Sequence, residues 1–296
     1  MASYILGKIN IDDEKLKRDL EIHNEFPKIA EEYDEFGTGF WQNCTLWSWT
    51  SDELNTMYKD YDYPIQQTRY GKALTYIDEL IRGNFTFNNL KMVRTRNLID
   101  GMVIPHKDFV ELERSKDQYF RVFIPLEDNE YAFHSDEENV FQMKKGEVWF
   151  LDAAIVHAAI NFSNKSRIFL CLDYAFPGPF SPKDVFINDS VYNPNLDPTI
   201  IKREEVSSDF KESLVTSLSK VISKYNFRDI VFLLSKIHFY KNISVSDCYD
   251  WLVEITEKSG DSSVYNKAIN LRRFLVEERK LGERFSFNFS ESEQLV

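Results

Sequence analysis

Two histidines and one aspartate have the residue types and the spacing of a metal site. His106 and Asp108 are separated by one residue, and His157 opens another apolar run farther along. Side chains at positions i and i+2 of a strand project from the same side, so a strand here would present His106 and Asp108 together. Two imidazoles and one carboxylate on one face of a metal leave coordination positions open, which is typical of non-haem iron(II) enzymes that activate oxygen.

Two other histidines are also followed two residues later by an acid, so this spacing alone does not select the site. His23 and Glu25 fall in a predicted surface helix, where positions i and i+2 diverge. His134 and Asp136 lie within the predicted strands and remain a competing pair, although they leave room for only one hairpin before His157. Another metal, or an ordinary β core with hydrogen-bonded histidines, also stays open at this point.

Four arginines lie where they could meet the carboxylates of small ligands. Arg167 follows His157 in the next predicted strand, where its guanidinium can clamp a distal carboxylate through two parallel hydrogen bonds. Arg94, Arg96 and Arg121 lie within apolar strands of an acidic chain. Because buried charge needs a partner, these three either form internal salt bridges or bind a substrate carboxylate and the inner carboxylate of a 2-oxoacid.

Charge and composition limit the partners and the location. A formal net charge of −12 argues against nucleic acid and against an anionic membrane, because no basic stripe is available to bind either one. The start of the chain lacks a basic segment followed by a long apolar run, and no stretch approaches the roughly 20 apolar residues of a membrane span. We therefore expect a cytoplasmic protein. The three cysteines form no C-x-x-C pair, which predicts buried free thiols.

The elements around these residues predict a β core preceded by helices. Short apolar and β-branched runs separated by turn signals predict strands over 91–99, 102–110, 119–126, 140–143, 147–151, 156–162 and 168–176. Short strands at this spacing indicate an antiparallel sandwich or jelly roll. The region before them predicts a strand over 3–9, a helix opening at 11–13, a strand and loop over 36–49, and a helix over 71–82.

A cluster of prolines between 177 and 182 marks the end of the strand region. Beyond it the apolar spacing returns to that of helices, over 210–225, 227–239, 246–258 and 262–281. We therefore predict a β domain with N-terminal helices at 1–185 and an all-helical C-terminal region at 186–296.

Longer blocks of the sequence resemble the bacterial free L-proline 3-hydroxylases, within the wider aspartyl/asparaginyl hydroxylase-like group of 2-oxoglutarate oxygenases. The resemblance extends nearly from end to end. Its blocks are YILGKI at 4–9, EEYDEFGTGFW at 31–41, VRTRN at 93–97, VIPHKDFVELER at 103–114, DQYFR at 117–121, AFHSD at 132–136, GEVWFLDAAIVHAAINF at 146–162, NFRDIVFLLSKIH at 226–238 and ERFS at 283–286.

This resemblance implies a double-stranded β-helix (jelly-roll) core with a helical C-terminal extension, and it implies a role for each candidate residue. The implied catalytic ligands of Fe(II) are His106, Asp108 and His157; the implied partners of the co-substrate 2-oxoglutarate are Arg167, which would take the C5 carboxylate, His134 and Arg121; and the implied substrate-binding residues are Arg94, Arg96 and Arg121.

The activity implied by the resemblance is hydroxylation of an unactivated carbon of a free L-amino acid, with O2 as oxidant and L-proline at its 3-position as the expected substrate. The stretch 45–63, with its tryptophans and acidic residues, departs from the proline enzymes. The same chemistry on L-lysine at C4, on L-pipecolate or on another free amino acid therefore stays open. The alternative outside the enzymes is a cupin-like module that binds a metal and a 2-oxoacid without turnover.

Overall fold

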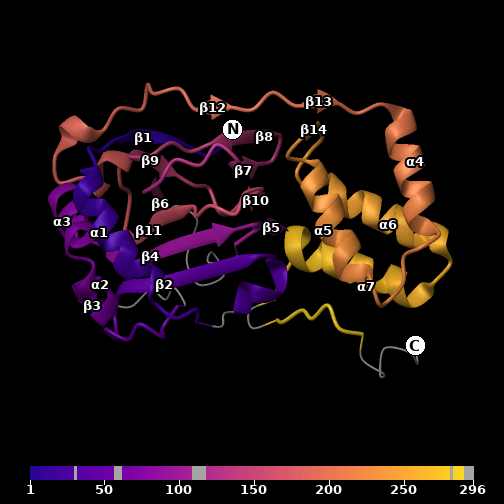
Figure 1. Ribbon diagram of the computed structural model, residues 1–296, viewed down its shortest axis with the longest axis horizontal. Coiled ribbons are helices and arrows are strands. Elements are labelled where there is room, and N and C mark those ends of the chain that lie inside the picture. The colour runs from indigo at the N-terminus through magenta and orange to yellow at the C-terminus, as the bar shows by residue number, and fades with distance from the viewer. Residues whose placement is uncertain (30–31, 57–61, 109–117, 281–282, 290–296) are drawn as a thin grey trace.

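Two antiparallel sheets form the centre of the molecule in the computed structural model, which describes residues 1–29, 32–56, 62–108, 118–280 and 283–289 (Figure 1). The seven-stranded sheet has the order β1 (Tyr4–Lys8), β9 (Glu147–Phe150), β6 (Tyr119–Pro125), β11 (Ile168–Ala175), β4 (Leu90–Ile99), β2 (Phe40–Ser48) and β3 (Gln66–Gln67). The five-stranded sheet has the order β12 (Thr199–Ile200), β8 (Asn139–Gln142), β7 (Ala132–Asp136), β10 (His157–Asn161) and β5 (Gly101–His106).

The helices lie in two groups on either side of these sheets (Figure 1). The first group contains α1 (Asp13–Asn24), α2 (Arg69–Ala73) and α3 (Thr75–Asn84), with the 3-10 helix η1 (Glu32–Phe36) in the same part of the chain. The second group contains α4 (Ser208–Ser219), α5 (Phe227–Ile237), α6 (Asp247–Ser259), α7 (Ser262–Arg272) and the π-helical turn η6 (Arg273–Glu277). Along the chain, the 3-10 helices η4 (Pro182–Val185) and η5 (Asp189–Val191) come between the two groups.

The core strands from β4 to β11 are connected as a jelly roll. Along the chain they alternate between the two sheets, except that β7 and β8 are neighbours in the smaller one. The resulting inner orders are β9-β6-β11-β4 and β8-β7-β10-β5, the arrangement of a double-stranded β-helix. The predicted antiparallel β core is confirmed. The last two residues of the predicted strand 102–110 lie outside the described residues.

The outer face of the larger sheet is buried by the N-terminal helices. Leu16 of α1 and Ile77 of α3 pack against Val93, Val122 and Leu170 from three of its strands. Burial of apolar area on this scale is what fixes the helices to the sheet, at about 25 cal/mol per Å² removed from water. The sequence predicts one helix over 71–82, but the chain forms two, because Leu74 leaves the helical region with ψ of 75°.

A second apolar core joins the smaller sheet to the C-terminal helices. Met102 and Ile104 of β5 and Ile160 of β10 contact a cluster that contains Trp251 and Leu271. This core places the helices behind the strands that carry His106 and His157, on the right of Figure 1. The helical region therefore supports the candidate site from outside the jelly roll.

The prediction of an all-helical region at 186–296 is wrong in three short segments. Thr199–Ile200 pairs with Phe141 and Gln142 at the edge of the smaller sheet. Such pairing satisfies backbone groups that an edge strand would otherwise expose. Two further segments, β13 (Glu204–Glu205) and β14 (Lys241–Asn242), pair with each other in parallel. Strands of two residues carry no sequence periodicity, so the apolar pattern could not indicate them.

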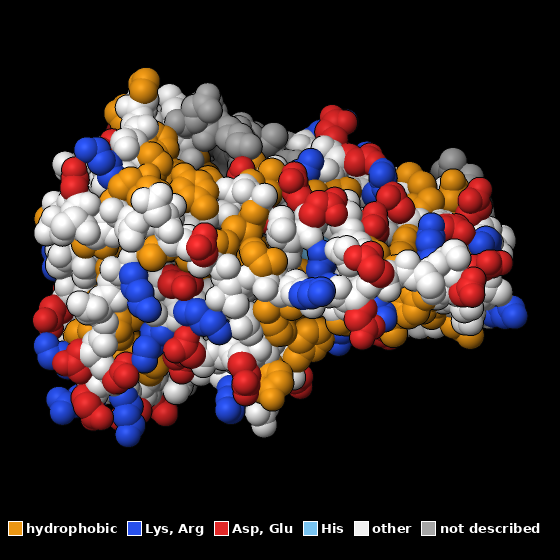
Figure 2. All heavy atoms as spheres, turned by 90° about the horizontal axis from the view of Figure 1, so that it is seen from above, with side chains coloured by type: hydrophobic (Ala, Val, Ile, Leu, Met, Phe, Trp, Pro, Cys, Tyr) orange, Lys and Arg blue, Asp and Glu red, His pale blue; other side chains and the backbone are white. Residues whose placement is uncertain are grey.

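The surface carries charges of both signs in close mixture. Figure 2 shows one face, on which acidic and basic side chains alternate and no stripe of one sign forms. Within the described part of the chain, no helix combines the length and the apolar character that crossing a bilayer requires.

Candidate metal centre

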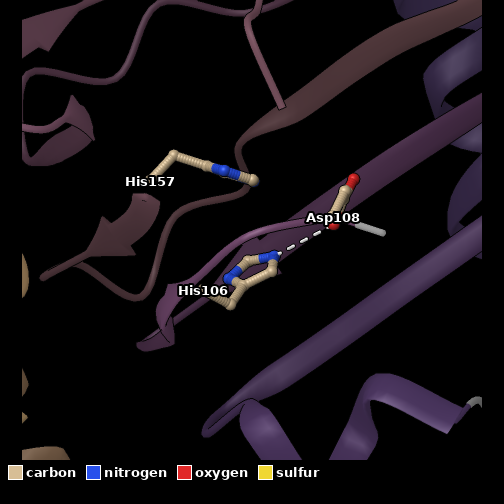
Figure 3. Close-up of side chains that lie close together, drawn as sticks. All are labelled: His106, Asp108 and His157. Atoms are coloured by element: carbon tan, nitrogen blue, oxygen red, sulfur yellow. Dashed lines mark ion pairs between the residues drawn. The ribbon is translucent and has the colours of Figure 1, made fainter. Parts of the chain in front are cut away.

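His106, Asp108 and His157 come together where β5 ends and β10 begins (Figure 3). One ligand atom from each residue lies within 4.8 Å of the others, and all three residues are buried. Among the described residues, this is the only group of histidine, cysteine or acidic side chains that is close enough to hold a metal ion. The geometry brings together the residues that the sequence selects.

The strands deliver these side chains in a way that differs slightly from the prediction. His157 opens β10 and lies directly opposite His106 of β5 in the antiparallel ladder. Asp108 lies beyond the end of β5 rather than within a strand. Its backbone N–H donates to the carbonyl of Ala153 at 2.9 Å, and this contact holds the carboxylate beside the two imidazoles.

Both imidazoles are oriented with the same nitrogen toward the protein. Nδ1 of His106 lies 2.8 Å from the carbonyl oxygen of Ile104, and Nδ1 of His157 lies 3.0 Å from that of Ile155. A carbonyl only accepts, so each Nδ1 carries a proton, and Nε2 is the nitrogen left to face a metal. Burial, and then the nearby His106, lower the pKa of His157 to about 3, which keeps this ring neutral. Two imidazoles that turn Nε2 toward the site, together with a carboxylate, fit a divalent iron site.

Asp108 is ionised and is held from one side by Arg121. Burial alone would raise the pKa of this carboxyl, but the Arg121 guanidinium and then the neighbouring His106 and His157 hold it well below its usual range. Nη1 of Arg121 donates to Oδ2 of Asp108. The other oxygen, Oδ1, lies 3.3 Å from Nε2 of His106 (dashed in Figure 3). Asp108 therefore presents one oxygen to the histidines and the other to the arginine.

The C-terminal helical region fixes the backbone on both sides of His106. The hydroxyl of Tyr249 donates to the carbonyl of Pro105 at 2.5 Å. The N–H of Lys107 donates to the carbonyl of Leu275 at 2.9 Å. Neither contact has a local sequence signal, because the partners lie far apart in the chain.

Asp173 of β11 anchors two of the predicted arginines. Its Oδ2 accepts from Nη2 of Arg94 at 2.6 Å, and its Oδ1 accepts from Nε of Arg121 at 2.8 Å. The hydroxyl of Tyr119 donates to the same Oδ1. Burial would raise the pKa of Asp173, but Arg121 and then Arg94 lower it, so the group is ionised. Sequence reasoning left salt bridges open for Arg94 and Arg121 without identifying Asp173.

Arg167 and Arg96 form a contrasting pair. Within the described ranges neither one contacts a carboxylate, and Nε of Arg96 is buried without a hydrogen-bond partner. Burial, and then the charge of Arg96, lower the pKa of Arg167 to about 9. Nη2 of Arg167 lies 2.7 Å from Nδ1 and 2.8 Å from Nε2 of His134. Since a guanidinium only donates, His134 must be neutral, and burial followed by Arg167 lowers its pKa well below the ordinary value.

The competing pair of the sequence does not form a metal group. His134 lies beside Arg167, while the carboxylate of Asp136 accepts from the backbone N–H groups of Ala2 and Ser3 at 3.1 and 2.7 Å. The other competing histidine, His23, is in a helix as predicted, but it is fully buried rather than on the surface. Its Nε2 lies 2.7 Å from the hydroxyl of Thr95.

Comparison with known proteins identifies the family. The family model described as "Aspartyl/Asparaginyl beta-hydroxylase" matches residues 9–177. The family model described as "L-proline 3-hydroxylase, C-terminal" matches residues 182–283. L-proline cis-3-hydroxylases 1 and 2 of a Streptomyces species are each 45% identical over 97% of this chain and 99% of theirs.

The chain belongs to the L-proline 3-hydroxylase family. The resemblance predicted from the sequence blocks is thereby confirmed. L-proline cis-4-hydroxylase of Rhizobium meliloti is 31% identical over 97% of this chain and 100% of its own. Among solved structures, a Burkholderia pseudomallei oxidoreductase of the 2OG-Fe(II) oxygenase family is 16% identical and covers 56% of this chain and 80% of its own. The TM-score of this match is 0.36.

In this member of the L-proline 3-hydroxylase family, an apolar wall lies beside Arg96. Trp41, Leu98, Val103 and Ala159 form a small cluster between the two sheets, and the Arg96 guanidinium lies 6.0 Å from the Trp41 ring. Nε1 of Trp41 is buried and has no hydrogen-bond partner among the described residues. A buried donor without a partner needs an explanation, and a ligand that accepts from it is one.

Proposed function

We propose that the protein is an Fe(II)- and 2-oxoglutarate-dependent dioxygenase that hydroxylates free L-proline at its 3-position. The observation that carries this proposal is the set of His106, Asp108 and His157 in a jelly roll that also holds Arg167, which is buried, and Arg96, which is half-buried, neither with an acidic partner in the described chain. Relatives that are named L-proline cis-3-hydroxylases, at 45% identity over nearly the whole length, favour proline and the 3-position.

The metal site assigned here has the donor set for ferrous iron. His106 and His157 would bind through Nε2 and Asp108 through Oδ1. When bound, ferrous iron and 2-oxoglutarate supply the oxidising power that inserts one oxygen atom of O2 into a C–H bond, with succinate and carbon dioxide as co-products. The chain itself supplies orientation, burial and charge.

Arg167 and His134 would hold the C5 carboxylate of 2-oxoglutarate. Arg167 is nearly inaccessible, at 4% exposure, and its uncompensated charge is costly until an anion binds. The guanidinium offers two parallel N–H groups to a carboxylate, an arrangement that a lysine cannot reproduce. His134, neutral in this structure, fixes the orientation of the guanidinium.

Arg96 would bind the carboxylate of the amino acid, together with Nε1 of Trp41. Both donors are buried without partners, and both lie at the apolar wall formed by Leu98, Val103 and Ala159. A small apolar ring such as that of proline fits such a wall, because it loses no hydrogen bonds on burial. The resemblance also implied ligand contacts for Arg94 and Arg121. Because both guanidinium groups are already paired with Asp173, we instead assign the two ligand carboxylates to Arg167 and Arg96.

The domain division into 1–185 and 186–296 is part of this proposal. It is supported by the two family descriptions, which divide between residues 177 and 182. The β domain would carry the chemistry, and the helical region would support β5 through Tyr249 and Leu275.

A panel of amino acids tests the proposed function. The purified protein is incubated with Fe(II), 2-oxoglutarate, ascorbate and O2, and with L-proline, L-pipecolate or L-lysine. We expect a hydroxyproline in a one-to-one ratio with succinate, and slower or no turnover of the other two. Hydroxylation of L-lysine or L-pipecolate alone would change the substrate, whereas binding of metal and 2-oxoglutarate without succinate from any amino acid would contradict an enzyme.

A further inference from the structure

Asp173 occupies an unusual position for an acidic residue. It lies in β11 between Leu172 and Tyr174, is 0% exposed, and faces Arg121 across the ladder to β6. An unpaired charge here would strongly destabilise the folded protein. Its two oxygens accept from three donors on neighbouring strands, Arg94 and Arg121 as guanidinium groups and Tyr119 as a hydroxyl.

Arg121 transmits the position of Asp173 to the metal ligand. Its Nε donates to Asp173 and its Nη1 donates to Oδ2 of Asp108, so one planar group bridges the two carboxylates. Because a guanidinium is rigid, fixing one edge on Asp173 fixes the direction of the other edge. Arg94 is also fixed on its far side, since its Nη1 donates to the carbonyl of Thr56 at 2.8 Å.

The orientation of Asp108 decides how many coordination positions remain open at the metal. A carboxylate can bind through one oxygen or through both, and the second mode would occupy a position that co-substrate and oxygen require. With Oδ2 engaged by Arg121, only Oδ1 faces His106. Groups that hold ligating residues in this way change metal affinity or activity by roughly 10- to 100-fold when they are removed.

We propose that Asp173 is a positioning residue that acts through Arg121 to keep Asp108 a one-oxygen metal ligand. This inference rests on the proposed function, because it assigns the metal to His106, Asp108 and His157. It adds a residue on β11 that does not itself touch metal, co-substrate or substrate. Tyr119 has the same role to a smaller degree, because it supplies one of the three donors that hold Asp173.

Binding of Co(II) to the metal-free full-length protein tests this inference without turnover. Asp173→Asn is expected to weaken the affinity for Co(II) roughly 10- to 100-fold and to alter the d–d absorption, which reports coordination number. Tyr119→Phe is expected to weaken it by a smaller factor. In an Arg121→Gln background, Asp173→Asn should cause no further loss, because its effect passes through Arg121.

Two matched controls separate positioning from general stability. Asp19→Asn changes another buried aspartate, one that accepts from the N–H of Ile77 on the outer face of the larger sheet. Tyr174→Phe changes a buried tyrosine of the same strand that donates to the carbonyl of Thr86. Both are expected to lower the unfolding temperature without changing the affinity for Co(II).

The affinity and the spectrum of bound Co(II) distinguish a positioning role of Asp173 from a purely structural one. If Asp173→Asn or Tyr119→Phe loses stability but binds Co(II) as tightly and with the same spectrum as the unmodified protein, the inference is overturned. Should Asp173→Asn fail to fold, Tyr119→Phe against Tyr174→Phe decides, because each removes a single hydroxyl. If the unmodified protein itself binds no Co(II), the proposed function fails instead.

Discussion

The four arginines inside the jelly roll differ in one respect, the presence of an acidic partner. Arg94 and Arg121 are bound by Asp173, and Arg121 also by Asp108, whereas Arg96 and Arg167 have no acid among the described residues. Charges that are already paired hold geometry, and charges that are unpaired cost free energy until a ligand arrives. Position in the sequence does not distinguish the two kinds, since Arg94 and Arg96 are two residues apart on one strand.

The largest effect is expected at Asp108, the carboxylate through which the paired Arg121 reaches the metal site. Asp108→Ala should abolish turnover with the fold intact, because Arg121 keeps Asp173 as a partner while the metal loses its carboxylate. Succinate formation and circular dichroism measure the two properties. Asp136→Ala, which removes the acid of the competing pair, should keep turnover. Substantial activity in Asp108→Ala would contradict the assignment of Asp108 as a metal ligand.

Substitution of Arg167 or Arg96, the two arginines without an acidic partner, should in each case weaken the binding of one ligand only. Arg167→Gln is expected to raise the KM for 2-oxoglutarate roughly 10- to 100-fold with little change in that for L-proline, and Arg96→Gln the reverse, because each loses a charged hydrogen bond. Steady-state kinetics over both substrates measure this. If Arg94→Gln produced either pattern instead, Arg94 rather than Arg167 or Arg96 would bind that ligand.

Without ligands, substitution of a paired arginine should lower the free energy of unfolding more than substitution of an unpaired one. In metal-free protein, Arg121→Met is expected to cost about 3–5 kcal/mol of unfolding free energy, because it leaves carboxylates buried without their partner. Arg167→Met should cost less than about 1 kcal/mol or stabilise, because it removes a charge that has no partner. Urea titrations measure both values. Equal losses would mean that Arg167 has an acidic partner after all.

A pH dependence of stability that comes from histidines away from the four arginines gives the baseline for these measurements. Burial lowers the pKa of His23 to about 4, and burial followed by Arg203 lowers that of His238 to about 3. Unfolded histidines titrate near 6.5, so acidification below about 6.5 protonates the unfolded chain first and lowers stability. Stability should therefore be full above this pH and should fall toward pH 4. His23→Gln should reduce this slope, and an unchanged slope would exclude His23 as a cause.

Much of the site was predictable because it depends on local rules. The His106–Asp108 spacing can be read within three residues, and it indicated two members of the observed metal group. The apolar runs of the strands can be read within a few residues each, and they indicated the observed jelly roll. The strand predicted over 168–176 agrees with β11 (Ile168–Ala175). Alternation along β11 would also have placed Asp173 on the same face as Phe169 and Cys171, an unused signal for an acid that needs a partner.

The remainder depends on contacts between distant segments. The pairing of Asp173 with Arg121, and the bonds from Tyr249 and Leu275 that fix the strand of His106, exist only after the sheets and helices assemble. The burial of His23 was missed for the same reason, because its partner Thr95 comes from β4. Periodicity indicates which elements form, but it does not indicate which side chains meet between them.

A crystal structure of the protein with Ni(II), 2-oxoglutarate and L-proline would test the contrast between the paired and the unpaired arginines most directly. We expect the C5 carboxylate of 2-oxoglutarate on Arg167 and the carboxylate of proline on Arg96, with Arg94 and Arg121 still bound to Asp173. Either carboxylate seated on Arg94 or Arg121, with Asp173 displaced from them, would contradict the account.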